Sequence, residues 1–201
     1  MKQILKTGVA MVLLGGLLCG CAEKKETPAE TAPAAAENLH HAEIKVKDYG
    51  VMTIELDANA APLTVENFMS LAEEGFYDGL TFHRIMDGFM IQGGDPSGNG
   101  SGGSGTKIPG EFKSNGWDNS ISHVSGTISM ARAKHPDSAS SQFFIMVGDA
   151  TYLDGNYAAF GHVTDGLDVA LQIAADAEPV DDNGTILPEA QPVIEYVKVL
   201  D

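Results

Sequence analysis

The chain has 201 residues, of which 43% are hydrophobic, so it is long enough for one packed domain with additional segments. Its 28 acidic residues against 12 basic ones give a formal net charge of -16, which argues against a nucleic-acid-binding groove and against electrostatic docking on anionic lipid. The 23 glycines favour a loop-rich, mainly β protein over a helical one.

Residues 1–20 have the composition of a targeting segment rather than of a folded domain. Two lysines precede an apolar run, Val9 to Leu18, that is too short for a permanent membrane span. The run ends in Leu-Cys-Gly-Cys, which resembles the lipobox of bacterial lipoproteins. This resemblance implies cleavage before Cys21 and attachment of lipid to its thiol. An ordinary secretory signal is the alternative.

Residues 21–40 form the expected lipidated cysteine and a linker. This segment is rich in Ala, Glu, Pro and Thr and has almost nothing large and apolar, so we expect a flexible chain. The pair His40-His41 could suggest a metal site, but no other ligand follows at a useful spacing, and we expect a solvated junction. Residues 41–201 are expected to form one domain, and they contain no cysteine for a disulfide.

The domain begins with a predicted hairpin and a helix. Residues 42–46 and 51–56 alternate apolar and polar side chains around a turn sequence, which is typical of two paired strands. Pro62 is a good residue for the first turn of a helix, and Gly75 ends the pattern. Between them the apolar residues recur at helical spacing: Val65, Phe68, Met69 and Ala72.

A second hairpin is predicted over residues 82–96. Two short apolar runs, 82–86 and 89–92, flank Asp87-Gly88, and glycine tolerates the positive φ that a tight hairpin turn requires. Gly93-Gly94 then ends the second run.

The polar residues of this hairpin suggest chemistry. Alternation with period two places Arg84 beside Phe82 on one face of the first strand, and Met90 with Gln92 on the second strand. The alternative is an amphipathic hairpin whose arginine and glutamine simply face solvent. His83 falls on the opposite face, where we expect a hydrogen-bonded structural role rather than acid–base catalysis.

Residues 93–110 are expected to form a long exposed loop. Its glycines suggest phosphate binding, but a P-loop needs Lys before Ser or Thr, and here Thr106 precedes Lys107. Pro109-Gly110 comes next, so no helix-forming run follows the glycines.

The second half of the domain is predicted to be mostly strands. Residues 127–131, 143–147, 158–163 and 193–200 read as strands, and 165–175 read as an amphipathic helix. The chain has many short predicted strands, only two helices and no regular alternation of strands with helices. This combination indicates an antiparallel barrel or sandwich.

Four motifs in a fixed order resemble the cyclophilin family of peptidyl-prolyl isomerases. They are FHRIMDGFMIQGGDP (82–96), SGTISMARA (125–133), SQFFIM (141–146) and YLDGNYAAFGHV (152–163). The resemblance extends from about residue 42 to 201. It implies an all-β protein with two helices, a closed eight-stranded antiparallel β-barrel capped by two α-helices. It also implies rotation of X-Pro peptide bonds as the activity, without a cofactor or metal.

The resemblance assigns roles by motif match. Arg84 corresponds to the catalytic arginine, with Phe89 and Gln92 beside it. Tyr152 stands where a Trp is usual and Tyr157 where a His is usual, which puts cyclosporin affinity in doubt. The expected substrate-binding residues are Phe89, Met90, Gln92, Ala131, Phe144, Leu153, Tyr152 and Tyr157.

The sequence also yields expectations about partners and location. Proline-containing peptides and unfolded envelope proteins are the expected substrates of a monomer without nucleic-acid partners. A lipid anchor would hold it at the outer membrane facing the periplasm, because Ala22 replaces the Asp that usually retains lipoproteins at the inner membrane. The alternative is a tethered proline-peptide binding module or chaperone whose catalysis is incidental.

Overall fold

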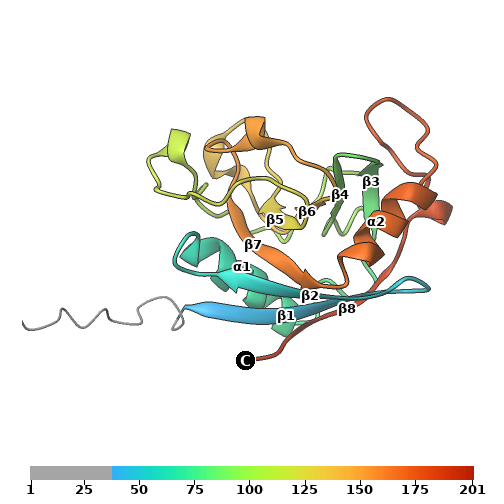
Figure 1. The fold of residues 1–201 in the computed structure, drawn as a ribbon, viewed down its shortest axis with the longest axis horizontal. Coiled ribbons are helices and arrows are strands. Elements are labelled where there is room, and N and C mark those ends of the chain that lie inside the picture. Colours follow the sequence, from blue (N-terminus) through green and yellow to red (C-terminus); the bar gives the residue numbers. More distant parts are fainter. Residues whose placement is uncertain (1–37) are drawn as a thin grey trace, which may run out of the picture. The chain divides into compact units, whose positions relative to one another are not determined.

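The computed structural model describes residues 38–201, so the expectations for the targeting segment, Cys21 and most of the linker lie outside the described residues. Within this part the chain forms eight strands and two α-helices (Figure 1). In chain order they are β1 (Leu39–Val46), β2 (Gly50–Asp57), α1 (Pro62–Glu73), β3 (Phe82–Met86), β4 (Met90–Gly93), β5 (Thr127–Met130), β6 (Phe143–Met146), β7 (Ala159–Asp165), α2 (Leu167–Asp176) and β8 (Ile194–Val199).

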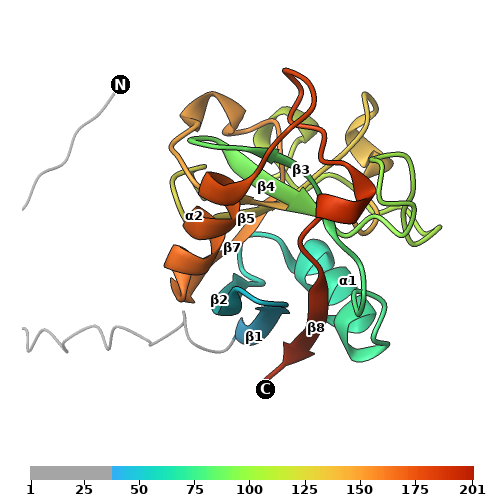
Figure 2. The ribbon, with the colours of Figure 1, turned by 90° about the vertical axis from the view of Figure 1, so that its right-hand side faces the viewer.

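All eight strands belong to one antiparallel sheet, in the order β3-β4-β6-β5-β7-β2-β1-β8. The sheet curls, so that β1, β2 and β8 lie below β3 and β4 in the view of Figure 1. The helices lie on opposite sides of the curl in Figure 2. Helix α1 packs against β8 and β2, and α2 packs against β2 and β4.

The expectation of a closed barrel is wrong, because the sheet is an open, curled half-barrel. No ladder joins the edge strands β3 and β8; the isolated bridges near them pair Thr81 with Val193, and Arg84 of β3 with Thr185, all but Arg84 outside the two strands. The segment before β8 cannot continue a ladder. It contains a 3-10 turn, Pro188–Ala190, and Pro192 has no N–H to donate.

The strands and helices otherwise lie close to their predicted places, with different ends. Strand β1 begins at Leu39, so the last two residues of the range expected for the linker belong to the strand. The turn between β3 and β4 contains Gly88 at a φ of +70°, which confirms the predicted hairpin. The predicted loop, residues 93–110, contains no helix, and only Gly93 belongs to a strand. It is not exposed throughout, because Asp95 and Ile108 are buried.

The main hydrophobic core lies inside the curl. It is built around fully buried aromatic rings, and Phe68 of α1 packs against Phe143 of β6 edge to face, with ring centroids 5.5 Å apart. Phe68 also packs against Tyr77 and Phe160 at 5.2 and 5.3 Å. Packing of Phe143 into this core fixes the position of β6. The opposite face of that strand remains available for a site.

Candidate active site

A second, smaller apolar cluster lies on the outer face of strands β3, β4 and β6. Because side chains alternate along a strand, Phe143 enters the core while Phe144 points to the other face. Strand register brings Gln92 opposite both Arg84 and Phe144, and Met90 opposite Met146. One pleated surface therefore carries an arginine, an amide, a thioether and an aromatic ring side by side.

These side chains border a cavity of about 140 Å³, here called the Arg84 pocket. Tyr152 is not among its lining residues. That side chain is 71% exposed, and its ring stacks on Phe89 with centroids 6.3 Å apart. The lining residues are Arg84, Phe89, Met90, Gln92, Ala131, Arg132, Phe144, Leu153 and Tyr157, so the structure brings together every other residue assigned to the site.

Two acceptors orient the guanidinium of Arg84. Its Nε donates to the backbone carbonyl of Asn183 at 2.7 Å, and Nη1 donates to Oε1 of Gln92 at 3.2 Å. The remaining neighbours are thioethers, with Nη2 lying 3.3 Å from Sδ of Met86. Sulfur is a weak acceptor, so the outer N–H groups of Arg84 are poorly satisfied and available to a ligand.

Burial lowers the pKa of Arg84 from its ordinary value. An arginine titrates so far above neutrality that the side chain remains charged. The partly buried position strengthens its electrostatic interaction with any group that enters the pocket, because the local dielectric constant is lower than in water.

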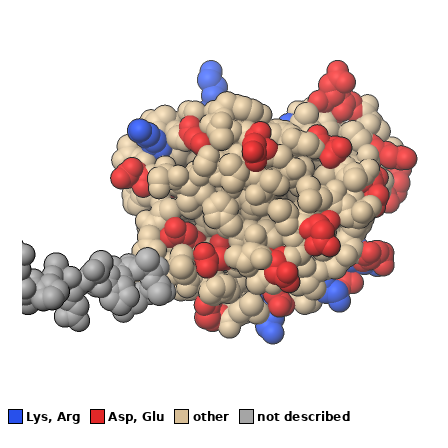
Figure 3. Space-filling model, in the orientation of Figure 1, with Lys and Arg blue, Asp and Glu red and all other residues tan. Residues whose placement is uncertain are grey.

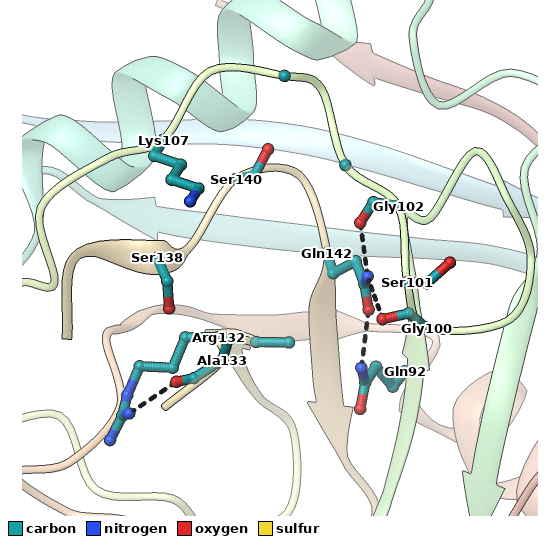
Figure 4. A pocket seen from close by; sticks show the side chains of 13 residues that line it. Gln92, Gly100, Ser101, Gly102, Lys107, Arg132, Ala133, Ser138, Ser140 and Gln142 are labelled. Atoms are coloured by element: carbon teal, nitrogen blue, oxygen red, sulfur yellow. Dashed lines mark hydrogen bonds between the residues drawn. The ribbon is translucent and has the colours of Figure 1, made fainter. Parts of the chain in front are cut away.

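A chain of amide hydrogen bonds connects Arg84 to the glycine-rich loop. Nε2 of Gln92 donates to Oε1 of Gln142 at 3.0 Å, and Nε2 of Gln142 donates to the carbonyls of Gly102 at 2.8 Å and Gly100 at 3.1 Å (Figure 4). Both amide orientations are thereby fixed. The loop, whose role the sequence leaves open, supports the side chain that orients the arginine.

The prediction for His83 is half wrong. The side chain lies on the face opposite Arg84 and is 4% exposed, as alternation predicts. Within residues 38–201, however, neither ring nitrogen has a hydrogen-bond partner. Burial lowers its pKa, so the ring is held neutral.

A buried histidine to which the sequence assigned nothing lies directly behind the pocket. His123 is completely buried, and its Nδ1 lies 2.8 Å from Oδ1 of Asp154 while Nε2 lies 3.0 Å from Oγ of Ser129. Its ring stacks on Phe144 with centroids 6.0 Å apart. Burial lowers the pKa of His123 although Asp154 opposes the shift. The neutral ring therefore acts as a flat support for Phe144.

Sequence reasoning missed several residues of the site. Arg132 and Gln142 belong to the quoted motifs, but a motif gives only the position of a residue in the sequence and not the groups that it contacts. The carbonyl of Asn183 lies 99 residues from Arg84 along the chain, and no local pattern signals that contact. Residues 38–201 contain no group of three or more His, Cys, Asp or Glu that could hold a metal ion. In this same part, no helix is long and apolar enough to cross a membrane.

Comparisons with known proteins identify relatives over most of the chain. The family described as cyclophilin type peptidyl-prolyl cis-trans isomerase/CLD matches residues 41–199. Peptidyl-prolyl cis-trans isomerase B of Bacillus subtilis is 42% identical over 146 residues, which cover 73% of this chain and 93% of the relative. A peptidyl-prolyl cis-trans isomerase of Synechococcus elongatus is 47% identical over 116 residues, 58% of this chain and 75% of the relative.

A solved structure shows the same similarity in three dimensions. The cyclophilin type peptidyl-prolyl cis-trans isomerase of Cryptosporidium parvum, crystallised in the presence of the dipeptide Ala-Pro, superposes with a TM-score of 0.68 at 29% sequence identity. The match covers 80% of this chain and 99% of the neighbour.

Proposed function

This chain belongs to the cyclophilin-type peptidyl-prolyl cis-trans isomerase family and is a peptidyl-prolyl cis-trans isomerase, and we propose that Arg84 is its catalytic group. The observation that carries the proposal is the arrangement of donors on Arg84. Nε and part of Nη1 are fixed by Asn183 and Gln92, and the other N–H groups contact only sulfur. An oriented, charged donor thus faces a small apolar pocket.

The reaction requires no bond to be made or broken between heavy atoms. Amide resonance sets a barrier of roughly 18–20 kcal/mol to rotation, whereas a turnover of about 10³ per second corresponds to roughly 13 kcal/mol. The site must therefore remove on the order of 6 kcal/mol, the difference between these two values. Stabilising the twisted amide is sufficient for this.

Arg84 can stabilise the twisted amide selectively. When the peptide bond is rotated by a quarter turn, resonance is lost and the prolyl nitrogen regains a basic lone pair. An N–H of Arg84 can then donate to that nitrogen, but it cannot do so in the planar ground state, so the interaction lowers the barrier. One preorganised donor of this kind contributes about 2.7–4 kcal/mol.

The Arg84 pocket would hold the proline ring while the preceding carbonyl rotates. Its volume of about 140 Å³ suits a single small ring, since a cavity of about 150 Å³ lined by apolar side chains accommodates benzene. Met90 and Phe144 are almost fully buried and form an apolar wall. Excluding water from this contact strengthens the hydrogen bond from Arg84.

Proline-containing peptides are the substrates that this pocket fits, and a related structure was crystallised in the presence of Ala-Pro. The test is an assay of the purified protein on a short X-Pro peptide, beside Arg84→Ala. Acceleration that collapses in the variant supports the proposal. If a folded wild-type protein bound the peptide without acceleration, the alternative of a tethered binding module would stand instead.

We propose further that the protein is a lipoprotein of the cell envelope that assists folding of envelope proteins. The support is the sequence of residues 1–21, where two lysines, a short apolar run and Leu-Cys-Gly-Cys precede a linker. A fatty-acid label incorporated on Cys21, and lost in Cys21→Ser, would support this in a bacterial host that processes lipoproteins. An unlabelled protein that is cleaved and secreted would contradict it.

The proposal places the lipid at the outer membrane and treats the protein as a monomer. The support for the outer membrane is Ala22, which follows the lipidated cysteine in place of Asp. Separation of inner from outer membranes tests the first point. Size-exclusion chromatography of the protein with the lipid-bearing Cys21 replaced tests the second.

A further inference from the structure

The carbonyl that accepts from Nε of Arg84 lies in the segment between α2 and β8, which is drawn in orange-red at the upper right of Figure 1. The N–H of Ile85 donates to the carbonyl of Gly184 at 2.8 Å, and Arg84 pairs with Thr185 in an isolated antiparallel bridge. The segment is thus attached to the strand that carries Arg84. Asn183, whose carbonyl orients the guanidinium, comes directly before the point of attachment.

The tip of this turn is exposed to solvent. Asp181, Asp182 and Asn183 are exposed, whereas Gly184 is buried. Apolar packing can hold the segment from Gly184 onward, but it cannot hold the exposed residues before it. An exposed segment with few buried contacts is free to move unless hydrogen bonds fix it. The position of the Asn183 carbonyl therefore depends on polar contacts made within the tip.

The carboxylate of Asp181 makes these polar contacts. Its Oδ1 accepts the backbone N–H groups of Asn183 and Thr185, each at 3.0 Å, and its Oδ2 accepts the hydroxyl of Thr185 at 2.9 Å. The N–H of Gly184 also donates to the backbone carbonyl of Asp181 at 3.1 Å. A short acidic side chain that accepts a backbone N–H two residues further on fixes a turn in this way.

The same contacts keep Asp181 ionised. The hydrogen bonds from the backbone and the hydroxyl of Thr185 lower the pKa of Asp181 from its ordinary value. At neutral pH the side chain is therefore a carboxylate, which can only accept hydrogen bonds.

Asp182 provides a natural comparison, because it has the same charge and is also exposed. Within residues 38–201 its side chain accepts no hydrogen bond and forms no ion pair. The two neighbouring residues thus separate two possible effects of a carboxylate on this turn. Both supply a negative charge, but only Asp181 supplies hydrogen bonds that shape the backbone.

We propose that Asp181 is a positioning residue of the isomerase, which acts by holding the carbonyl of Asn183 against Nε of Arg84. This inference rests on the proposed function, because it assumes that Arg84 donates to the prolyl nitrogen. When the turn is formed, the guanidinium keeps one direction and its outer N–H groups face the Arg84 pocket. Without the contacts of Asp181, Nε loses a fixed acceptor, and the guanidinium is less often directed at the twisted amide.

The effect should appear in kcat rather than in KM. Arg84 interacts with the prolyl nitrogen only in the twisted state, whereas the apolar walls of the pocket also bind the planar peptide. Loss of orientation therefore lowers kcat and kcat/KM by the same factor and leaves KM unchanged. Asp181→Ala should lower both about threefold to tenfold on a short X-Pro peptide, the size of one typical hydrogen bond. A turn with a purely structural role would lower the melting temperature without lowering kcat.

Two further variants separate hydrogen bonding from charge. Asp181→Asn keeps a side-chain oxygen that can accept the two backbone N–H groups, so it should retain most of the wild-type kcat although it removes the charge. Asp182→Ala removes the same charge from the neighbouring position and should act as wild type. If Asp182→Ala or Asp181→Asn lost as much kcat as Asp181→Ala, charge rather than the shape of the turn would be responsible, and the inference would be overturned.

A double-mutant cycle tests whether Asp181 acts through Arg84. In the Arg84→Ala background, Asp181→Ala should have no further effect on kcat, because the group that it positions is gone. An additive further loss would overturn the inference. So would a wild-type kcat in Asp181→Ala, provided that Arg84→Ala loses activity and circular dichroism shows each variant folded. A wild-type kcat in Arg84→Ala would instead overturn the proposed function.

Discussion

At the scale of single residues, the site depends on amide and ring side chains that do not touch substrate themselves but hold in position the residues that do. Gln142 does not line the Arg84 pocket, yet it fixes the amide of Gln92, which in turn accepts from Arg84. His123 is buried behind Phe144 in the same supporting position. Gln142 belongs to the motif of residues 141–146, whereas His123 lies outside the four quoted motifs.

Gln142→Ala should lower kcat/KM about threefold to tenfold. The variant loses the hydrogen bonds to Gln92 and to the loop, so Arg84 is less well oriented. One typical hydrogen bond contributes about 0.5–1.5 kcal/mol, which corresponds to a change of this size. Isomerisation of an X-Pro peptide and circular dichroism would measure rate and fold. Gln172→Ala, on the exposed surface of α2, is the matched control and should act as wild type. A wild-type rate for Gln142→Ala would show that the amide chain does not orient the arginine.

Stability should fall as the pH drops below about 6.5, the ordinary pKa of histidine. Burial lowers the pKa of His123 in the folded protein, so between the two values the unfolded chain binds a proton that the folded chain does not, and acid favours unfolding. His83 has a lowered pKa for the same reason and adds to the loss.

The measurement is the melting temperature as a function of pH in wild type, His123→Gln and His83→Gln. Each variant should show a smaller decrease between neutral and mildly acidic pH than the wild type does. An identical decrease in all three proteins would mean that neither buried ring is responsible.

At the scale of elements, distant segments stabilise the ends and turns that hold the site. Helix α1 has no capping side chain of its own before Pro62. Its first N–H groups instead donate to the buried carboxylate of Glu111, from Leu63 at 2.9 Å and from Thr64 at 2.7 Å. A negative group at this place also interacts favourably with the helix dipole.

Glu111→Ala should lower the free energy of unfolding by about 3 kcal/mol, since hydrogen bonds to a charged group contribute about 1.5–3 kcal/mol and the helix N–H groups would be left unpaired. Glu66→Ala, an exposed glutamate on the same helix, should change it by less than about 0.5 kcal/mol. Urea denaturation measures both. Similar small effects of the two substitutions would contradict the capping role.

Gly184→Ala tests the turn that holds Arg84. Gly184 has a φ of +84°, and an added Cβ would lie 2.5 Å from the carbonyl oxygen of Ile85. The turn would have to shift, moving the neighbouring carbonyl of Asn183 away from Nε of Arg84, and kcat/KM should fall severalfold. The free energy of unfolding should decrease by about 1–2 kcal/mol, because alanine is strained in a left-handed backbone conformation.

Gly79→Ala is the control for this prediction. Gly79 has a similar φ of +80°, but an added Cβ would meet nothing within 4 Å. It should lose stability through backbone strain while keeping the wild-type kcat/KM. Equal losses of activity in the two variants would show that the turn at Gly184 has no special influence on Arg84.

The sequence predicted elements well where the signal was local. Alternation around Asp87-Gly88 located the hairpin of β3 and β4, and Arg84 does lie opposite Gln92. The expectation that Phe82 shares the face of Arg84 is wrong, because the register shifts between these two residues and Phe82 packs against Phe143 in the main core.

The sequence could not predict how the sheet ends, because that depends on Pro192 and on the turn before β8 meeting β3 across a hundred residues. It also could not predict that both nitrogens of His83 lack partners, because alternation gives the face and not the neighbours.

At the scale of the whole molecule, the many acidic side chains are absent from the lining of the Arg84 pocket, which contains two arginines and no Asp or Glu. Figure 3 shows acidic side chains spread over the visible face, with few basic ones between them. The neighbouring cavity between the glycine-rich loop and the segment that connects β5 to β6 likewise includes Lys107 and Arg132 and no Asp or Glu among its lining residues. The curled sheet uses its inner face for stability and the outer face of β3, β4 and β6 for the Arg84 pocket, so the site can change without disturbing the core.

The most direct test of this account compares kcat/KM on a short X-Pro peptide for wild type, Arg84→Lys and Arg84→Ala. We predict that Arg84→Ala loses at least about tenfold, since one preorganised donor contributes about 2.7–4 kcal/mol. Arg84→Lys should recover little, because lysine cannot contact Asn183, Gln92 and the prolyl nitrogen with one planar fork. Unchanged turnover by a folded Arg84→Ala protein would contradict the central claim, and the apolar pocket alone would then have to account for catalysis.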